Sequence, residues 1–168
     1  MKITIRKALP EDAFEYAACH IASWRSAYAG IVPDEHLNSL SAVDRAERLK
    51  KNMREVKDYA YYCAICEKEI IGILIIGKSS DEEKPAAGEI GAIYLVEAFL
   101  GKGVGKKMMD YALNALKRDG YEDVILWVLE ENKRARQFYE KCGFVFDGAK
   151  KTIEIGTPLI EIRYVRRA

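Results

Sequence analysis

The stretch that decides the fold is residues 89–106, which read EIGAIYLVEAFLGKGVGK. It begins as an apolar, strand-like run, Ile90 to Val96, and continues into a helix-like segment. Between the two, Gly101, Gly103 and Gly105 let the backbone turn tightly with no Cβ in the way of a ligand. A helix that starts there directs its unpaired N–H groups and the positive end of its dipole at the loop. The stretch therefore predicts an anion site, whose usual occupant is a phosphate or pyrophosphate.

The composition of the 168 residues is that of a soluble globular protein. Apolar residues make up 49% and charged residues 32%, which argues against disorder, and a formal net charge of +1 gives no reason to expect nucleic acid. No run reaches the roughly 18 apolar residues that span a bilayer, and the N-terminus lacks the apolar core of a signal peptide. We expect one domain over residues 1–168 in a cytoplasmic protein, with no nucleic-acid or membrane partner. The sequence is compatible with both a monomer and a homodimer.

Around this stretch, helical spacing and strand-like runs alternate as in an α/β domain. The predicted helices start at Pro10, Asp34, Ser41, after the glycine loop, and near Ala135. The predicted strands cover residues 2–7, 59–66, 70–76, 89–96, 124–129, 144–146 and 153–165.

Two known nucleotide-binding patterns can be aligned with the glycine loop, residues 101–105. A P-loop needs glycine at Leu100 and a hydroxyl residue at Lys107, so that pattern fails twice. The dinucleotide-binding pattern G-x-G-x-x-G, aligned from Gly101 or Gly103, has Lys106 or Met108 where its third glycine should be. This mismatch weakens the interpretation as a dinucleotide site. Glu130, just after the next strand, could still imitate the acid that binds ribose.

The spacing of Cys63 and Cys66 raises the question of a redox or zinc motif. They lie in a strand-like run, where residues three apart face opposite sides of the sheet. Histidines and further cysteines at ligand spacing are missing nearby. We expect buried structural cysteines and no metal site.

Two blocks of sequence resemble the GNAT superfamily of acetyl-CoA-dependent N-acetyltransferases. Residues 93–105 are similar to its strand–loop–helix element, and residues 132–144 are similar to its signature N-x-x-A-x-x-F-Y-x-x-x-G-F. Both blocks are in register, and the resemblance covers nearly the whole chain. It implies an α+β fold with a mixed, mostly antiparallel central sheet of about six to seven strands flanked by helices. Leu100 and Glu97 depart from the pattern, where the family usually has glutamine or arginine and proline.

The resemblance implies acetyl-CoA as co-substrate, held by the backbone of the strand, the glycine loop and the second motif. The Leu95 N–H would polarise the thioester carbonyl. The implied cofactor-binding residues are Ile93, Tyr94, Leu95, Gly101, Lys102, Gly103, Val104, Gly105, Lys106, Asn132 and Tyr139. For Asn132, an ordinary helix N-cap is the competing interpretation.

Acetyl transfer needs a base for the amine and an acid for the departing thiolate. Glu89 is the candidate base: even spacing puts it on one strand face with Gly91, Ile93 and Leu95. Tyr139 is the candidate acid, because a phenol has a higher pKa than a thiol. The competing interpretation of Glu89 is an exposed acid at the start of a strand. That of Tyr139 is an aromatic residue of the core.

In this family the first helix and the following loop usually wall the acceptor pocket. His20, Trp24 and Tyr28 share one helix face, and His36 follows, so these four are acceptor-site candidates; helix packing is the alternative. The resemblance implies transfer of the acetyl group to a primary amine, of a small molecule or a peptide or protein N-terminus, by direct attack in a ternary complex. A non-catalytic acyl-CoA-binding or sensor module is the main alternative, and a nicotinamide-dependent oxidoreductase a distant one.

Overall fold

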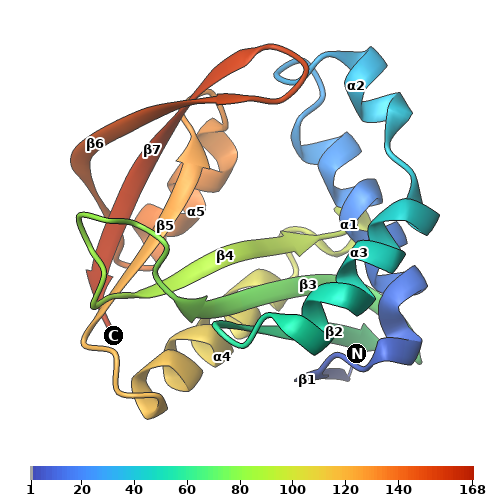
Figure 1. Ribbon diagram of the computed structural model, residues 1–168, viewed down its shortest axis with the longest axis horizontal. Coiled ribbons are helices and arrows are strands. Elements are labelled where there is room, and N and C mark those ends of the chain that lie inside the picture. The colour runs from blue at the N-terminus through green and yellow to red at the C-terminus, as the bar shows by residue number, and fades with distance from the viewer. Residues whose placement is uncertain (1) are drawn as a thin grey trace.

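The computed structural model describes residues 2–168, in which one seven-stranded sheet runs through the molecule with helices on both faces (Figure 1). In chain order the elements are β1 (Ile3–Lys7), η1 (Pro10–Asp12), α1 (Ala13–Ala27), α2 (Asp34–Ser39), α3 (Ala42–Glu55), β2 (Tyr59–Cys66), β3 (Glu69–Lys78), β4 (Gly88–Leu95), η2 (Glu97–Phe99), α4 (Val104–Arg118), β5 (Asp123–Leu129), α5 (Lys133–Lys141), β6 (Val145–Glu154) and β7 (Pro158–Arg167). None of the helices within residues 2–168 has the length and apolar character needed to cross a membrane.

The strand order is β1-β2-β3-β4-β5-β7-β6. Within residues 2–168 only β4 and β5 pair in parallel, and every other neighbouring pair is antiparallel. The predicted mixed, mostly antiparallel sheet flanked by helices is confirmed.

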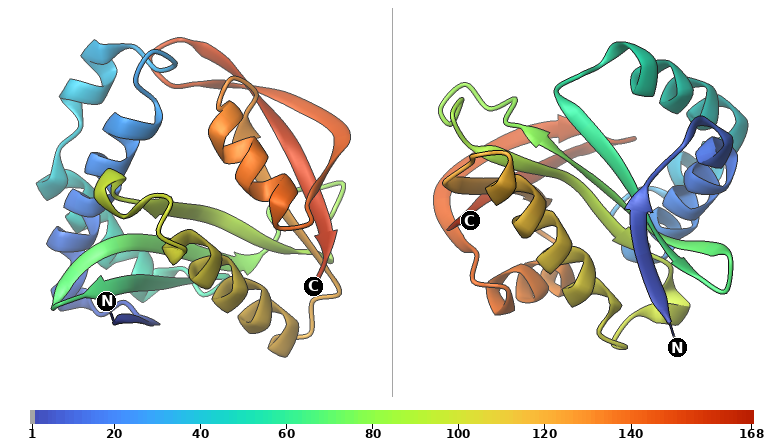
Figure 2. Two further views of the ribbon diagram at one scale, coloured as in Figure 1. Left: turned by 180° about the vertical axis from the view of Figure 1, so that it is seen from behind. Right: turned by 90° about the horizontal axis from the view of Figure 1, so that it is seen from below.

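Each face of the sheet has its own core. On one face, α4 packs the fully buried Met108, Met109 and Leu116 against β3, β4 and β5, and α5 lies on the same side (Figure 2). On the other face, α1 packs Ala13 and Tyr16, and α3 lies outside it. Burial of apolar side chains on both faces stabilises the central strands, which read as nearly continuous apolar runs for that reason.

The sheet divides in its middle. Strands β4 and β5 pair only at Gly88 with Val124 and Glu89 with Ile125, and beyond these pairs they diverge (Figure 1). All of β5 pairs with β7, from Asp123 with Arg167 to Leu129 with Glu161, so the second half of the sheet moves away as one piece. Among the described residues, one edge of β4 therefore has no strand partner after Glu89.

A β-bulge interrupts β4 at this point. Ile75 and Ile76 of β3 pair with Ala92 and Ile90, so Gly91 has no partner in the described part of β3. An extra residue in one strand reverses the facing of every side chain beyond it.

The bulge corrects one prediction about Glu89. Ile90, Ile93 and Leu95 all pack on the α4 side, whereas Tyr94 packs on the α1 side. Because Glu89 precedes Ile90, it lies on the same side of the strand as Tyr94. The predicted common face of Glu89 with Ile93 and Leu95 is wrong, since it assumed unbroken alternation.

The C-terminal strands also differ from the predicted ones. The run 153–165 is not one strand: β6 already begins at Val145, and a turn around Gly156 separates it from β7. Gly156 has φ +69°, a conformation that suits glycine, and Pro158 follows it. The hairpin tip reaches α2, where His36 packs against Gly156 (Figure 1).

Candidate active site

A cavity of about 590 Å³ lies where β4 and β5 diverge, with walls from α1, β4, α4, β5, α5, β6 and β7. At one end are the glycine loop and the start of α5, and at the other are carboxylates and aromatic rings. The predicted site residues that line it are Tyr28, Glu89, Ile93, Tyr94, Leu95, Gly101, Gly103, Gly105, Lys106, Asn132 and Tyr139.

The unpaired edge of β4 presents backbone groups to the cavity. The Val96 N–H donates to the Ile71 carbonyl of β3 at 2.9 Å. In an antiparallel pair, hydrogen-bonded residues alternate with residues whose N–H and C=O point the other way. Leu95 and Ile93 therefore turn their N–H groups away from β3 and toward the gap.

The glycine loop ends in the N-cap of α4. Gly101 and Gly103 have φ of +73° and +78°, and a Cβ at either position would meet no atom within 4 Å. The glycines are needed for left-handed backbone rather than for space. The first N–H groups of α4, from Val104 onward, have no intrahelical acceptor. The Val104 side chain itself is buried in the core, so it offers a ligand its backbone N–H and no side-chain contact.

Three cationic side chains near the glycine loop differ in their access to the cavity. Lys106 lines it but pairs with Asp110 of its own helix. The Lys102 ammonium lies over the Phe99 ring, 5.5 Å from its centroid, and is not on the wall. Arg134 of α5 is on the wall and was not predicted, because it occupies a variable position of the second motif.

Asn132 both caps α5 and lines the cavity. Its Oδ1 accepts a hydrogen bond from the Ala135 N–H at 3.2 Å, which satisfies one of the free donors of the helix. This confirms the N-cap interpretation. The amide Nδ2 makes no hydrogen bond within residues 2–168 and can still serve a ligand.

Tyr139 projects from α5 into the core, where its ring packs against Phe138, Phe144 and Tyr164. It is 9% exposed, and its hydroxyl has no hydrogen-bond partner within residues 2–168. Burial raises the pKa of Tyr139, and the neighbouring Tyr94 and Cys142 add to the effect. The phenol therefore stays protonated at neutral pH and can donate to a group in the cavity.

Glu89 is 8% exposed at the point where β4 and β5 part. Its Oε2 accepts hydrogen bonds from the N–H of Ser80 at 2.9 Å and from the Ser80 hydroxyl at 3.2 Å. Its Oε1 makes none within the described part of the chain. A carboxylate held by one oxygen and open at the other is suited to accept a proton.

Three cavity residues at this end were not predicted: Trp127 of β5, Lys151 of β6 and Glu161 of β7. Lys151 Nζ lies 3.7 Å from Glu161 Oε2 and 4.1 Å from the centroid of the Trp127 ring. Burial raises the pKa of Glu161, Lys151 opposes this effect, and the like charge of Glu89 adds to it. The turn signal at Gly156 to Pro158 could have separated the strands and so placed Glu161.

Of the four acceptor-site candidates, Tyr28 alone lies on the cavity wall. His20 lies behind Tyr94, with ring centroids 5.0 Å apart, and Arg45 Nη1 lies 3.0 Å from its Nδ1. Burial lowers the pKa of His20 to about 3, and the Arg45 charge contributes. His20 is thus a neutral packing residue.

Trp24 and His36 lie away from the cavity wall as well. The Trp24 ring packs under the Arg45 guanidinium, 5.0 Å from the ring centroid to Cζ. His36 packs against the turn of the β6–β7 hairpin at Gly156. Both pack between elements next to the cavity and do not form its surface.

Comparison with known proteins gives one family. The model of the acetyltransferase (GNAT) family matches residues 21–144. A probable N-acetyltransferase of Mycobacterium tuberculosis is 30% identical, with 99% of this chain and 95% of that protein covered. A spermidine N(1)-acetyltransferase of Thermoplasma acidophilum is 26% identical, with 86% and 89% covered.

A solved structure has the same fold. The crystal structure of the PaiA N-acetyltransferase from Thermoplasma acidophilum, in complex with coenzyme A, superimposes with a TM-score of 0.81. All of both chains is covered, at 23% sequence identity. At that level of identity, the comparison shows that the two proteins share a fold.

Proposed function

The chain belongs to the acetyltransferase (GNAT) family and is an acetyl-CoA-dependent N-acetyltransferase, and we propose that its acceptor is a positively charged primary amine. The observation that carries the proposal is the pair of carboxylates, Glu89 and Glu161, on the wall of one cavity. Lys151 offsets the charge of Glu161 but not that of Glu89. Carboxylates favour an ammonium group and disfavour an anionic acceptor. The spermidine-acetylating relative supports polyamines as the first acceptors to test.

The donor occupies the other end of the cavity in this proposal. Acetyl-CoA supplies the acetyl group as a thioester. The first N–H groups of α4 bind its pyrophosphate, with Arg134 and Lys106 adding positive charge. The β4 backbone at Ile93 and Leu95 pairs with the extended pantetheine arm, as an added strand would.

Transfer then uses three groups of this chain. Glu89 takes a proton from the amine, directly or through a water, because most of a lysine-like amine is protonated at neutral pH. The neutral nitrogen attacks the thioester carbon, and the Leu95 N–H stabilises the negative charge that develops on the oxygen. As the carbon–sulfur bond breaks, Tyr139 donates its proton to the sulfur. The extra proton left on the nitrogen passes to the Tyr139 phenolate, directly or through a water, and Glu89 releases its proton to solvent. The products are therefore the amide, coenzyme A and one proton.

An acceptor screen tests the proposal. Purified protein and acetyl-CoA are incubated with spermidine, putrescine, aminoglycosides, neutral amino-acid amides, acidic amino acids and peptide N-termini, and free thiol is measured. We expect turnover with cationic amines and little with acidic ones. Preference for an acidic amine would contradict the acceptor class. Tight acetyl-CoA binding by calorimetry with no turnover on any amine would instead support the non-catalytic acyl-CoA-binding module.

A further inference from the structure

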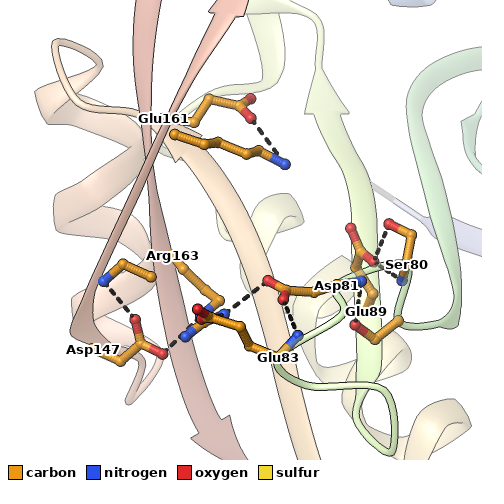
Figure 3. Close-up of polar contacts among 10 residues, drawn as sticks. Ser80, Asp81, Glu83, Glu89, Asp147, Glu161 and Arg163 are labelled. Carbon is orange, nitrogen blue, oxygen red and sulfur yellow. Dashed lines mark hydrogen bonds and ion pairs between the residues drawn. The ribbon is translucent and has the colours of Figure 1, made fainter.

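The loop between β3 and β4, residues 79–87, does more than join two strands. Ser80 gives both its N–H and its hydroxyl to the same oxygen of Glu89, at 2.9 and 3.2 Å (Figure 3). Two donors on Oε2 fix the plane of the carboxylate and direct Oε1 away from the loop. The orientation of Glu89 therefore depends on the position of this loop.

Arg163 of β7 holds the loop from its other side. Its Nη1 lies 2.9 Å from Asp81 Oδ2 and 2.8 Å from Glu83 Oε2, both loop residues (Figure 3). Its Nε donates to Asp147 Oδ2 of β6 at 2.7 Å. The Arg163 side chain is 7% exposed, and those of Asp81 and Asp147 are 9% and 16% exposed, so water and salt screen these two contacts little. The Glu83 side chain is exposed, and its contact with Arg163 is screened.

The two sets of contacts are joined within one dipeptide. Ser80 binds Glu89, and the next residue, Asp81, binds Arg163. The loop is tied to itself as well, because the Asp81 N–H donates to the Ser79 hydroxyl at 3.0 Å. Arg163 is not on the cavity wall. We infer that Arg163 is a positioning residue, which acts through Asp81 and Ser80 to hold the Glu89 carboxylate toward the acceptor amine.

This inference rests on the proposed role of Glu89 as the base. A merely structural Arg163 would join β6, β7 and the loop and contribute only to folding stability. The two roles predict different changes in kcat when the carboxylates that contact Arg163 are substituted. Asp81 and Asp147 provide a matched pair for this comparison.

Asp81 and Asp147 make the same kinds of contact. Each accepts from Arg163 through Oδ2, and each accepts through Oδ1 from the backbone N–H two residues ahead, at 2.9 Å for Asp81 and 3.0 Å for Asp147. Their side chains are 9% and 16% exposed. Only Asp81 adjoins Ser80. Asp81→Asn and Asp147→Asn therefore each weaken one contact with the same guanidinium, at Nη1 and Nε respectively. We expect only the first to affect Glu89.

The experiment measures kcat at saturating acetyl-CoA and the best amine of the screen, together with acetyl-CoA affinity and urea unfolding. A positioned base contributes about 10²–10⁴-fold, so we expect Glu89→Gln to lower kcat by about 100-fold. Asp81→Asn should lower kcat by about 10-fold with unchanged acetyl-CoA affinity. Asp147→Asn should unfold at a similarly lowered urea concentration yet keep kcat within about twofold. The double variant Asp81→Asn/Glu89→Gln should be no slower than Glu89→Gln alone, since the residues act as one unit.

Two outcomes overturn the inference while leaving the base in place: equal losses of kcat in Asp81→Asn and Asp147→Asn, or independent, additive losses in the double variant. If Glu89→Gln keeps the wild-type kcat, the base assignment fails and this inference fails with it. If Asp81→Asn does not fold, Ser80→Ala replaces it, because it removes one of the two donors without touching Arg163. Ser80→Ala should then lower kcat severalfold, and an unchanged kcat would contradict the inference.

Discussion

The hydroxyl of Tyr28, at the end of α1, lies 2.6 Å from the hydroxyl of Tyr94, near the end of β4. This hydrogen bond joins α1 to β4, two elements of the cavity wall. Burial raises the pKa of both phenols, so both stay protonated and one donates to the other. The pair thus links two walls of the cavity through one hydrogen bond.

Removal of one of the two hydroxyls should therefore lower the free energy of unfolding. Tyr28→Phe leaves the Tyr94 hydroxyl buried without this partner, and we expect the free energy of unfolding to fall by about 1–3 kcal/mol. Tyr28→Phe/Tyr94→Phe should recover part of the loss, since it leaves no unpaired hydroxyl. Urea unfolding of the two single variants and the double variant measures the coupling. Strictly additive losses would indicate that the two hydroxyls do not stabilise each other.

Tyr139→Phe separates the chemical step from binding. The ring stays packed against Phe144 and Tyr164, so acetyl-CoA affinity should change less than threefold. The proton donor is lost, and kcat should fall by about 100-fold. Tyr164→Phe removes a neighbouring hydroxyl that binds Arg136 and Glu140 outside the cavity, and serves as control. A Tyr139→Phe enzyme with wild-type kcat would remove Tyr139 from the mechanism.

The pH dependence of kcat tests the same assignment. Because burial raises the pKa of Tyr139, the phenol keeps its proton in the folded protein at pH values where a free tyrosine, pKa about 10, begins to lose it. Loss of the Tyr139 proton should therefore cause no fall in kcat between about pH 7 and pH 10. A falling limb in this range that Tyr139→Phe abolishes would show that Tyr139 titrates there and contradict the assignment.

Local pattern predicted much of this fold. The strand predicted at residues 59–66 is β2, and the Ser41 N-cap predicted for α3 accepts from the Asp44 N–H at 3.2 Å. Cys63 and Cys66 do face opposite cores, as strand alternation requires. Each of these follows from residues close together in the sequence.

What sequence reasoning missed depends on pairing between distant segments. The Gly91 bulge exists because β3 and β4 shift register there, and no periodicity within β4 records it. Glu161 reaches the cavity because β7 pairs with β5 opposite Leu129, across more than thirty residues of chain. The Arg163–Asp81 contact likewise joins a strand to a loop that are remote in sequence. Residue types alone could not have assembled this end of the site.

His20 should make folding stability depend on pH. Burial lowers its pKa to about 3 in the folded protein, whereas the unfolded chain has the ordinary value near 6.5. Between these values only the unfolded chain binds the proton, so stability is complete above about pH 6.5 and falls as pH decreases toward 3. From pH 6.5 to 4.5 the loss from this residue should be roughly 2 kcal/mol.

His20→Gln isolates that contribution, because glutamine can still accept from Arg45 but does not titrate. The difference in unfolding free energy between wild type and variant should be constant above pH 7 and shift in favour of the variant below pH 6. Urea unfolding at steps of half a pH unit measures it. Parallel curves from pH 7.5 to 4.5 would mean that His20 binds a proton in the folded protein.

The glycine loop can be tested with a control of equal strain. Gly103 and Gly30 have φ of +78° and +77°, and a Cβ at either would meet nothing within 4 Å, but Gly103 alone lines the cavity. Gly103→Ala and Gly30→Ala should each lower the free energy of unfolding by about 1–2 kcal/mol through left-handed backbone alone. Gly103→Ala should also weaken acetyl-CoA binding about tenfold, because relief of that strain moves the N–H groups at the start of α4. Gly30→Ala should bind acetyl-CoA as wild type does. Calorimetry on both variants decides the point: equal affinities would place the pyrophosphate elsewhere than at this helix terminus.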